Sequence, residues 1–141
     1  MVDFEAFLKK GEVRLQEKNI ILAKALIKSS EKAMNFVKTL KVNDETSEHI
    51  ISDSYDIMRE LIEAKLAAEG YKSYSHEATI LFLKKFPQFK ESEIDFLDNI
   101  RKIRNSIKYY GKESNETEAK KVLSFLNSIL PKLKKLIENV K

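Results

Sequence analysis

The chain has 141 residues, a formal net charge of +4 and 34% charged residues, and this length predicts a single domain over residues 1–141 with a core of its own. It contains no cysteine, which excludes disulfides, thiolate metal ligands and a cysteine nucleophile. Its first residues include acids and no apolar run, unlike a signal peptide, and no window approaches about eighteen apolar residues in a row. We therefore expect a cytoplasmic protein without a membrane partner.

The composition is rich in lysine, glutamate and isoleucine, which is typical of thermally stable, archaeal or thermophilic proteins. The small excess of positive charge is compatible with nucleic-acid binding, but lysines on solvated helix faces explain most of it. Three glycines and two prolines leave few places for the chain to turn. The sequence therefore predicts an all-α fold.

The first part of the chain predicts two helices. A short helix extends from Phe4 to about Leu15, although Gly11 weakens it. A stronger amphipathic helix runs from Asn19 to about Leu40. In its middle, Ser29 and Ser30 are small enough for a neighbouring helix to approach closely.

The middle of the chain predicts a long helix, a connection and a short helix. The long helix runs from about Glu45 to Glu69 and ends at Gly70. Its wide apolar stripe indicates contacts on two sides, as in a bundle. We expect Tyr71 to Ser75 to form a polar, aromatic connection. The short helix begins after Ser75, which is a suitable N-cap, and ends before Pro87.

Two more helices complete the predicted bundle. One begins at Glu91 or Ser92 and ends at Gly111. The other runs from about Thr117 to Val140, and its apolar residues alternate in spacings of three and four, which indicates a core-facing seam. The seam residues are Ala119, Val122, Leu126, Ile129, Leu133, Leu136 and Val140. The predicted fold is an up-and-down bundle of four to five helices.

Several kinds of functional site have no counterpart in the sequence. Gly11, Gly70 and Gly111 are isolated, so there is no glycine-rich phosphate loop. The two histidines, His49 and His76, belong to neither an HExxH nor an ExxH motif. We therefore expect no metal site and no cofactor.

The penultimate helix ends in a cluster of basic and aromatic side chains. In an ideal helix its core face holds Phe96, Ile100, Ile103 and Ile107. Arg101, Arg104 and Lys108 lie on the adjacent stripe and repel one another unless an anion, a carboxylate of another helix or a partner subunit neutralises them. Tyr109 and Tyr110 add aromatic surface. Cations beside aromatic rings suit a phosphate group and a base.

A simpler interpretation of these residues stays open. Cations near a helix C-terminus interact favourably with the helix dipole, and Gly111 is an ordinary residue just beyond such an end. Tyr109 and Tyr110 suit a helix end where the ring packs and the hydroxyl meets water.

The segment RNSIKY, from Arg104 to Tyr109, resembles the RNxxxH signature of HEPN domains, the higher eukaryote and prokaryote nucleotide-binding family. The resemblance covers nearly the whole chain. It includes two long opening helices, a break at Gly70, a short helix, the motif helix and a closing helix. The run GYKSYSHEA, which contains His76, is similar to the connection that many small prokaryotic HEPN proteins carry before their third helix.

The resemblance implies a helical bundle that forms a homodimer, in which the paired signature helices face a shared cleft. Active members of the family are metal-independent ribonucleases whose arginine and histidine act on the scissile phosphate. The polar residue after the arginine, here Asn105, supports them. Many members are toxins paired with a minimal nucleotidyltransferase antitoxin. In this chain the catalytic positions of the motif hold Arg104 and Tyr109.

Tyr109 departs from the family pattern because it stands where the motif has histidine. A histidine transfers protons near pH 7, whereas a tyrosine, with an ordinary pKa of about 10, is a poor base there. His76 would supply an imidazole only if the fold brought it to the cleft. Otherwise we expect it to be a capping or structural residue.

These observations leave three functions open. The one we favour is an RNA- or nucleotide-binding module without enzymatic activity, the partner of a nucleotidyltransferase in a toxin–antitoxin-type pair. Its expected binding residues are Arg101, Arg104, Asn105, Lys108, Tyr109 and Tyr110. The second is a metal-independent endoribonuclease toxin with residual activity through Arg104 and either Tyr109 or His76. The third is a structural dimer or adaptor whose basic helix end pairs with acids such as Glu60 or Glu63.

Overall fold

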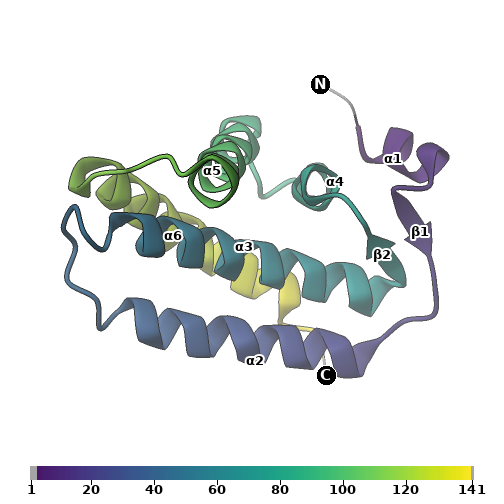
Figure 1. The fold of residues 1–141 in the computed structure, drawn as a ribbon. Helices are drawn as coiled ribbons and strands as arrows, with labels where there is room; N and C mark the ends of the chain where they lie inside the picture. The colour runs from purple at the N-terminus through teal and green to yellow at the C-terminus, as the bar shows by residue number, and fades with distance from the viewer. Residues whose placement is uncertain (1–2, 141) are drawn as a thin grey trace.

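The computed structural model describes residues 3–140 and shows a helical bundle (Figure 1). Its elements in chain order are α1 (Phe4–Lys10), β1 (Val13–Leu15), α2 (Ile20–Val37), α3 (Ser47–Glu69), β2 (Tyr71–Ser73), α4 (His76–Leu81), the 3-10 helix η1 (Phe82–Lys85), α5 (Glu91–Tyr110) and α6 (Glu116–Ile137). The predicted all-α class is confirmed for these residues, with one small two-stranded sheet added to it.

Helix α3 is the centre of the fold. It contacts α2, α4, α5 and α6, and its buried residues are distributed around most of its circumference. In Figure 1, α2 and α3 run side by side in opposite directions and α6 passes behind α3. Helices α4 and α5 are seen nearly end-on in the same view, so both cross α3 steeply.

The ends of the helices follow local capping signals, and the predicted boundaries of the four long helices are confirmed to within a few residues. The side chains of Asn19, Ser75 and Asn115 accept hydrogen bonds from backbone N–H groups in the first turns of α2, α4 and α6. Gly70 and Gly111 end α3 and α5 in the left-handed conformation, with φ of 87° and 66°.

The beginning of the chain differs from the prediction. Helix α1 ends at Lys10 rather than near Leu15, because Gly11 takes a left-handed φ of 77°. Strand β1 then pairs antiparallel with β2, so the connection after Gly70 contains a strand that the sequence did not predict. Val13 is buried, while the other two residues of β1 are exposed. Three residues are too few for an alternation of apolar and polar positions to show in the sequence.

The core lies between α3 and the helices packed around it. The predicted seam of α6 is confirmed, since its positions from Ala119 to Leu136 are buried. Helix α2 buries Ala23, Ser30 and Val37. Of the two serines expected to let a neighbouring helix approach closely, Ser30 is buried and Ser29 is exposed. Within residues 3–140, no helix has the combination of length and apolar character that crossing a membrane requires.

The buried face of α5 agrees with the predicted one only in part: Ile100 is buried as expected, and Ile103 and Ile107 are partly buried against the core. The buried residues are Ile94, Leu97, Ile100 and Arg104. Phe96, predicted to lie in the core, is 38% exposed and stacks on Phe125 of α6, with ring centroids 4.6 Å apart. The difference arises because α5 packs against both α3 and α4. The spacing of apolar residues alone does not show that an arginine lies on the buried line.

The two glycines that end α3 and α5 provide a test of how tightly the hairpin is held. A Cβ at Gly70 would lie 2.8 Å from the carbonyl oxygen of Gln16, whereas a Cβ at Gly111 would meet no atom within 4 Å. A left-handed φ costs an L-residue about 1–2 kcal/mol. We expect Gly111→Ala to lower the free energy of unfolding by about that amount, and Gly70→Ala to lower it further because β1 must move. Urea denaturation measures the free energy of unfolding of both variants. Equal losses of this free energy would show that β1 can move without destabilising the fold.

Candidate functional site

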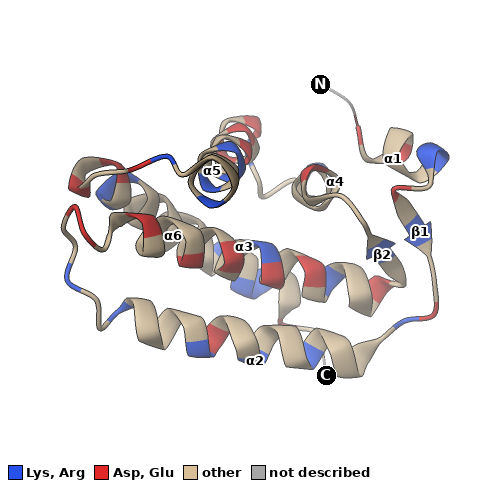
Figure 2. Cartoon of the chain, in the orientation of Figure 1, with Lys and Arg blue, Asp and Glu red and all other residues tan. Residues whose placement is uncertain are grey.

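Three of the four arginines of the chain come together where α5 crosses α3. Arg59 lies on α3, and Arg101 and Arg104 lie one turn apart on α5. Figure 2 shows mainly acidic residues along α3, with basic residues among them, and basic residues on α5 above it. All three guanidinium groups are close enough to Tyr55 to influence its pKa. We call Arg59, Arg101 and Arg104 the arginine cluster.

Arg104 occupies a position in the core of the bundle. Its side chain follows Leu97 and Ile100 on the buried line of α5, and the residue is only 7% exposed. Its guanidinium carbon lies 5.7 Å from the centre of the Tyr55 ring. One nitrogen is 3.5 Å from a carboxylate oxygen of Asp56. Within residues 3–140, the buried Nε has no hydrogen-bond partner, so a group with five donors is incompletely paired.

Asp56 on α3 is shared between two arginines. The same oxygen, Oδ1, lies 3.3 Å from Arg59 and 3.5 Å from Arg104. Arg59 also donates a 2.8 Å hydrogen bond to Glu63, one turn further along α3. Arg59 is therefore better paired than Arg104, because its bond to Glu63 is short and the contact of Arg104 with Asp56 is long. Asp56 therefore keeps the two guanidinium groups together and completes the pairing of neither.

Arg101 is paired more fully than Arg104. Its Nε donates a 2.7 Å hydrogen bond to Asp98 on α5, and a terminal nitrogen lies 3.4 Å from Glu77 on α4. The expected repulsion between Arg101 and Arg104 is thus relieved by carboxylates, including those of other helices. The acids that were expected to do this, Glu60 and Glu63, do not pair with either residue among those that the structure describes. Glu63 pairs with Arg59, and Glu60 lies next to Ser29 of α2.

A tyrosine and a histidine lie beside the arginine cluster. Tyr55 is fully buried, and in the described part of the chain its hydroxyl has no hydrogen-bond partner. Burial raises the pKa of this hydroxyl, and the three arginines oppose the shift only in part. The ring of His76, the first residue of α4, lies 6.2 Å from that of Tyr55. Loss of water around His76 lowers its pKa, and the nearby charge of Arg59 lowers it further. The fold therefore brings an imidazole close to Arg59 and Arg104.

The remaining predicted site residues lie apart from this cluster. Lys108, Tyr109 and Tyr110 are exposed at the end of α5, and the Lys108 nitrogen lies 5.6 Å from the centre of the Tyr109 ring. Five residues of an α-helix amount to a rotation of about 140° beyond a full turn, so Tyr109 points away from Arg104. Asn105 is partly buried next to Arg104 in sequence. The structure brings Arg101 and Arg104 together with His76, and not with Tyr109.

Most of the polar residues on α3 were missed in the sequence, where only Glu63 was named, as a possible partner of the basic helix end. Ser52, Asp56, Arg59 and Glu63 follow one another at spacings of four, three and four, and all are partly buried. Such spacing places them on one face of the helix. The signal in the sequence is a line of polar residues along a helix with a wide apolar stripe, and such a line indicates polar contacts with a neighbouring helix.

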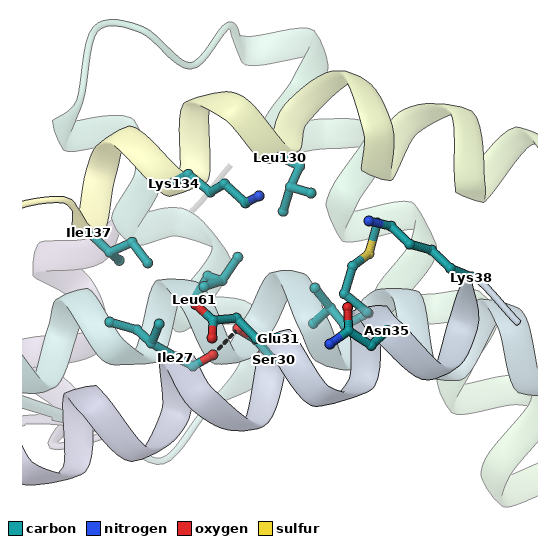
Figure 3. A pocket seen from close by; sticks show the side chains of 11 residues that line it. Ile27, Ser30, Glu31, Asn35, Lys38, Leu61, Leu130, Lys134 and Ile137 are labelled. Atoms are coloured by element: carbon teal, nitrogen blue, oxygen red, sulfur yellow. Dashed lines mark hydrogen bonds between the residues drawn. The ribbon is translucent and has the colours of Figure 1, made fainter.

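A separate groove of about 120 Å³ lies between α2, α3 and α6 (Figure 3). Apolar side chains such as Leu61 and Leu130 form much of its lining, and Glu31 and Lys134 are among its polar residues. Ser30 contributes its small side chain here, and its hydroxyl donates a 2.7 Å hydrogen bond to the carbonyl of Ile27. No residue of the arginine cluster lines this groove.

The chemistry available at the cluster is the binding of an anion. A guanidinium fixed by packing presents donors in a planar array that matches phosphate or carboxylate oxygens. Among residues 3–140, no group of three or more histidine, aspartate or glutamate side chains is placed to hold a metal ion. The cations of the cluster are matched by Asp56, Glu63, Glu77 and Asp98. Directed donors, rather than an excess of positive charge, therefore distinguish this site.

Comparison with known proteins finds no match: no protein-family model matches the chain, and neither a curated protein nor a solved structure does. The resemblance to HEPN domains therefore stays a prediction.

The lowered pKa of His76 gives a test of the site's electrostatics. We expect NMR titration to place this pKa below its ordinary value of about 6.5. Arg59→Gln should raise it, because a neighbouring cation is removed and Asp56 and Glu63 lose a partner. The remote variant Lys32→Gln should leave it unchanged. Because the unfolded chain takes up the proton first, stability should be fully present above about pH 6.5 and fall as the pH drops through the folded-state pKa. An unaltered His76 titration in Arg59→Gln would contradict this arrangement.

Proposed function

We propose that this chain is a HEPN-like module that binds a phosphate group of RNA or of a nucleotide at the arginine cluster. The observation that carries the proposal is the incomplete pairing of Arg104, which is buried, has an unpartnered Nε and has a single long ion pair. A buried charge is costly unless it is paired and hydrogen-bonded. A bound phosphate would supply the acceptors that Asp56 does not.

The surroundings of Arg104 support a site that is formed before the ligand arrives. The ring of Tyr55 and the shared carboxylate of Asp56 fix the guanidinium, so little side-chain freedom is lost on binding. Arg59 stands beside it through the same carboxylate. A phosphate that approached Arg104 would thus also come close to Arg59.

The wider part of the proposal rests on the resemblance of the Arg104 to Tyr109 segment and of the connection to His76. In this proposal the chain is a homodimer whose α5 helices face a shared cleft. It partners a minimal nucleotidyltransferase in a toxin–antitoxin-type pair.

The decisive variant is Arg104→Met, which removes the charge but keeps much of the buried volume. Replacing a buried ion pair by an apolar residue of similar size is often neutral or stabilising. We therefore expect an unchanged or higher unfolding temperature together with a loss of RNA or nucleotide affinity of at least about tenfold. Fluorescence anisotropy with labelled RNA at about 50 and 200 mM salt measures the affinity, and Lys32→Met serves as the matched control. If Arg104→Met loses stability but binds as the wild type does, Arg104 is a structural residue and the adaptor function is favoured.

A second function, metal-independent RNA cleavage, is favoured by the position of His76 near Arg59 and Arg104. Its lowered pKa keeps the imidazole neutral at pH 7, the form that accepts a proton. In such a reaction the 2′-oxygen bonds to the adjacent phosphorus and the bond to the 5′-oxygen breaks. The proton of the 2′-hydroxyl passes to His76, and the leaving oxygen takes up a proton from water. Arg104 would stabilise the charge on the phosphate.

This second function is tested by RNA cleavage in the presence of EDTA. We expect His76→Gln to reduce the rate by about 100-fold or more, the usual contribution of a general base, while leaving RNA affinity nearly unchanged. His49→Gln is the control, because it removes the other histidine. Cleavage that survives in His76→Gln but disappears in Tyr109→Phe would assign the proton transfer to Tyr109 instead. Absence of cleavage by the wild type would contradict this second function and leave RNA or nucleotide binding as the proposed function.

A further inference from the structure

The outward face of the β1–β2 hairpin carries an unusual pair of like charges. In the register of the sheet, Arg14 lies directly opposite Lys72, and both are exposed. Opposed like charges on neighbouring strands destabilise a sheet. Within residues 3–140, neither residue takes part in an ion pair, although Glu12 lies on the same face. An anion bound at this face would relieve the repulsion.

Both cations lie over the same aromatic ring. The ring of Tyr74 is 64% exposed. Its centre lies 5.5 Å from the guanidinium carbon of Arg14 and 5.9 Å from the Lys72 nitrogen. The backbone N–H of Tyr74 donates a 2.7 Å hydrogen bond to the carbonyl of Glu12, which continues the pairing of the hairpin beyond β2. Tyr74 therefore presents a solvent-accessible ring on a hydrogen-bonded backbone, with a cation from either strand beside it.

This ring is joined to His76, which lies beside the arginine cluster, by a short hydrogen-bonded connection. Tyr74 precedes His76 by two residues, so their Cα atoms lie within about 7 Å of each other. The Ser73 hydroxyl donates a 2.7 Å hydrogen bond to the carbonyl of Ser75 and accepts a 3.0 Å bond from Thr79. The Ser75 hydroxyl caps α4 by accepting from the N–H of Ala78. The distance between the ring and His76 is thus set by a hydrogen-bonded turn.

We propose that Tyr74, Arg14 and Lys72 form a stacking platform for an unpaired base of single-stranded RNA, whose adjoining phosphates extend toward the arginine cluster. This inference rests on the proposed function and specifies its ligand as a strand rather than a mononucleotide. An exposed aromatic ring flanked by cations is the arrangement that binds single strands, because a base stacks on the ring and the cations meet the backbone. In a duplex both faces of each base are already covered by neighbouring bases, so the platform selects unpaired RNA.

The chain contains no tryptophan, which allows a direct test. Tyr74→Trp places the single indole of the protein at the platform and keeps an aromatic ring there. We expect short oligouridine to quench its fluorescence at saturation, and the same strand annealed to its complement to quench it much less. Absence of quenching by a bound oligouridine, or equal quenching by the duplex, would overturn the inference.

Binding by the unlabelled chain gives the second measurement. Tyr74→Leu should weaken oligouridine binding by about 5- to 150-fold, the range found for loss of one stacked base, whereas Tyr74→Phe should bind as the wild type does. Arg14→Gln and Lys72→Gln should each reduce the salt dependence of log K by about one unit. Phe36→Leu, at an exposed aromatic residue on α2, is the matched control. Thermal unfolding checks that the hairpin variants are folded. Wild-type affinity in Tyr74→Leu would rule the platform out.

The same series separates failure of this inference from failure of the proposed function. If Arg104→Met loses RNA affinity and Tyr74→Leu does not, the phosphate site stands and the platform is wrong. If Tyr74→Leu loses affinity and Arg104→Met does not, the platform binds RNA and the arginine cluster is not its phosphate site.

Discussion

The Asp56 carboxylate is the contact on which the arrangement of the arginine cluster depends. One of its oxygens faces both Arg59 and Arg104, and without it two guanidinium groups would stand together at the edge of the core. Because Asp56 and Arg59 belong to α3 and Arg104 belongs to α5, the shared contact joins the two helices where they cross. Tyr55 completes the arrangement by placing its ring against the Arg104 guanidinium. The central helix therefore contributes a polar line as well as most of the core.

A buried arginine is a poor choice for stability alone. An apolar residue at position 104 would continue the line of Leu97 and Ile100 without any desolvation cost, and buried ion pairs are often no more stabilising than such residues. The orphaned Nε of Arg104 and the orphaned hydroxyl of Tyr55 point the same way, since buried polar groups normally find partners. Buried polar atoms without hydrogen-bond partners are most readily understood at a place where a ligand supplies those partners.

Much of the fold followed from the sequence, and the site followed only in part. Helix ends were predictable because capping is local: Asn19, Ser75, Gly70 and Gly111 act through their own turns. The β1–β2 hairpin was not, because its partners are separated by a long helix pair and each strand has only three residues. Arg101 and Arg104 were recognised as a pair, whereas the roles of Asp56 and Arg59 depend on how two helices cross. That crossing is decided by tertiary packing, which also turned Phe96 outward.

If the chain binds RNA as proposed, the charges of the molecule would divide the contributions to affinity between two places. At the arginine cluster the cations are nearly balanced by carboxylates, so a polyanion gains little there from long-range attraction and must bind through directed hydrogen bonds. At the hairpin, Arg14 and Lys72 have no ion pair within the described chain, and exposed cations of this kind contribute most to the salt-dependent part of nucleic-acid affinity. A strand would thus be attracted to the hairpin first, and the short turn from Tyr74 to His76 would then bring its phosphate to Arg104. On this view the balanced charges of the cluster favour selectivity. An anion too short to contact both the hairpin and the arginine cluster would bind with lower affinity than a strand that contacts both.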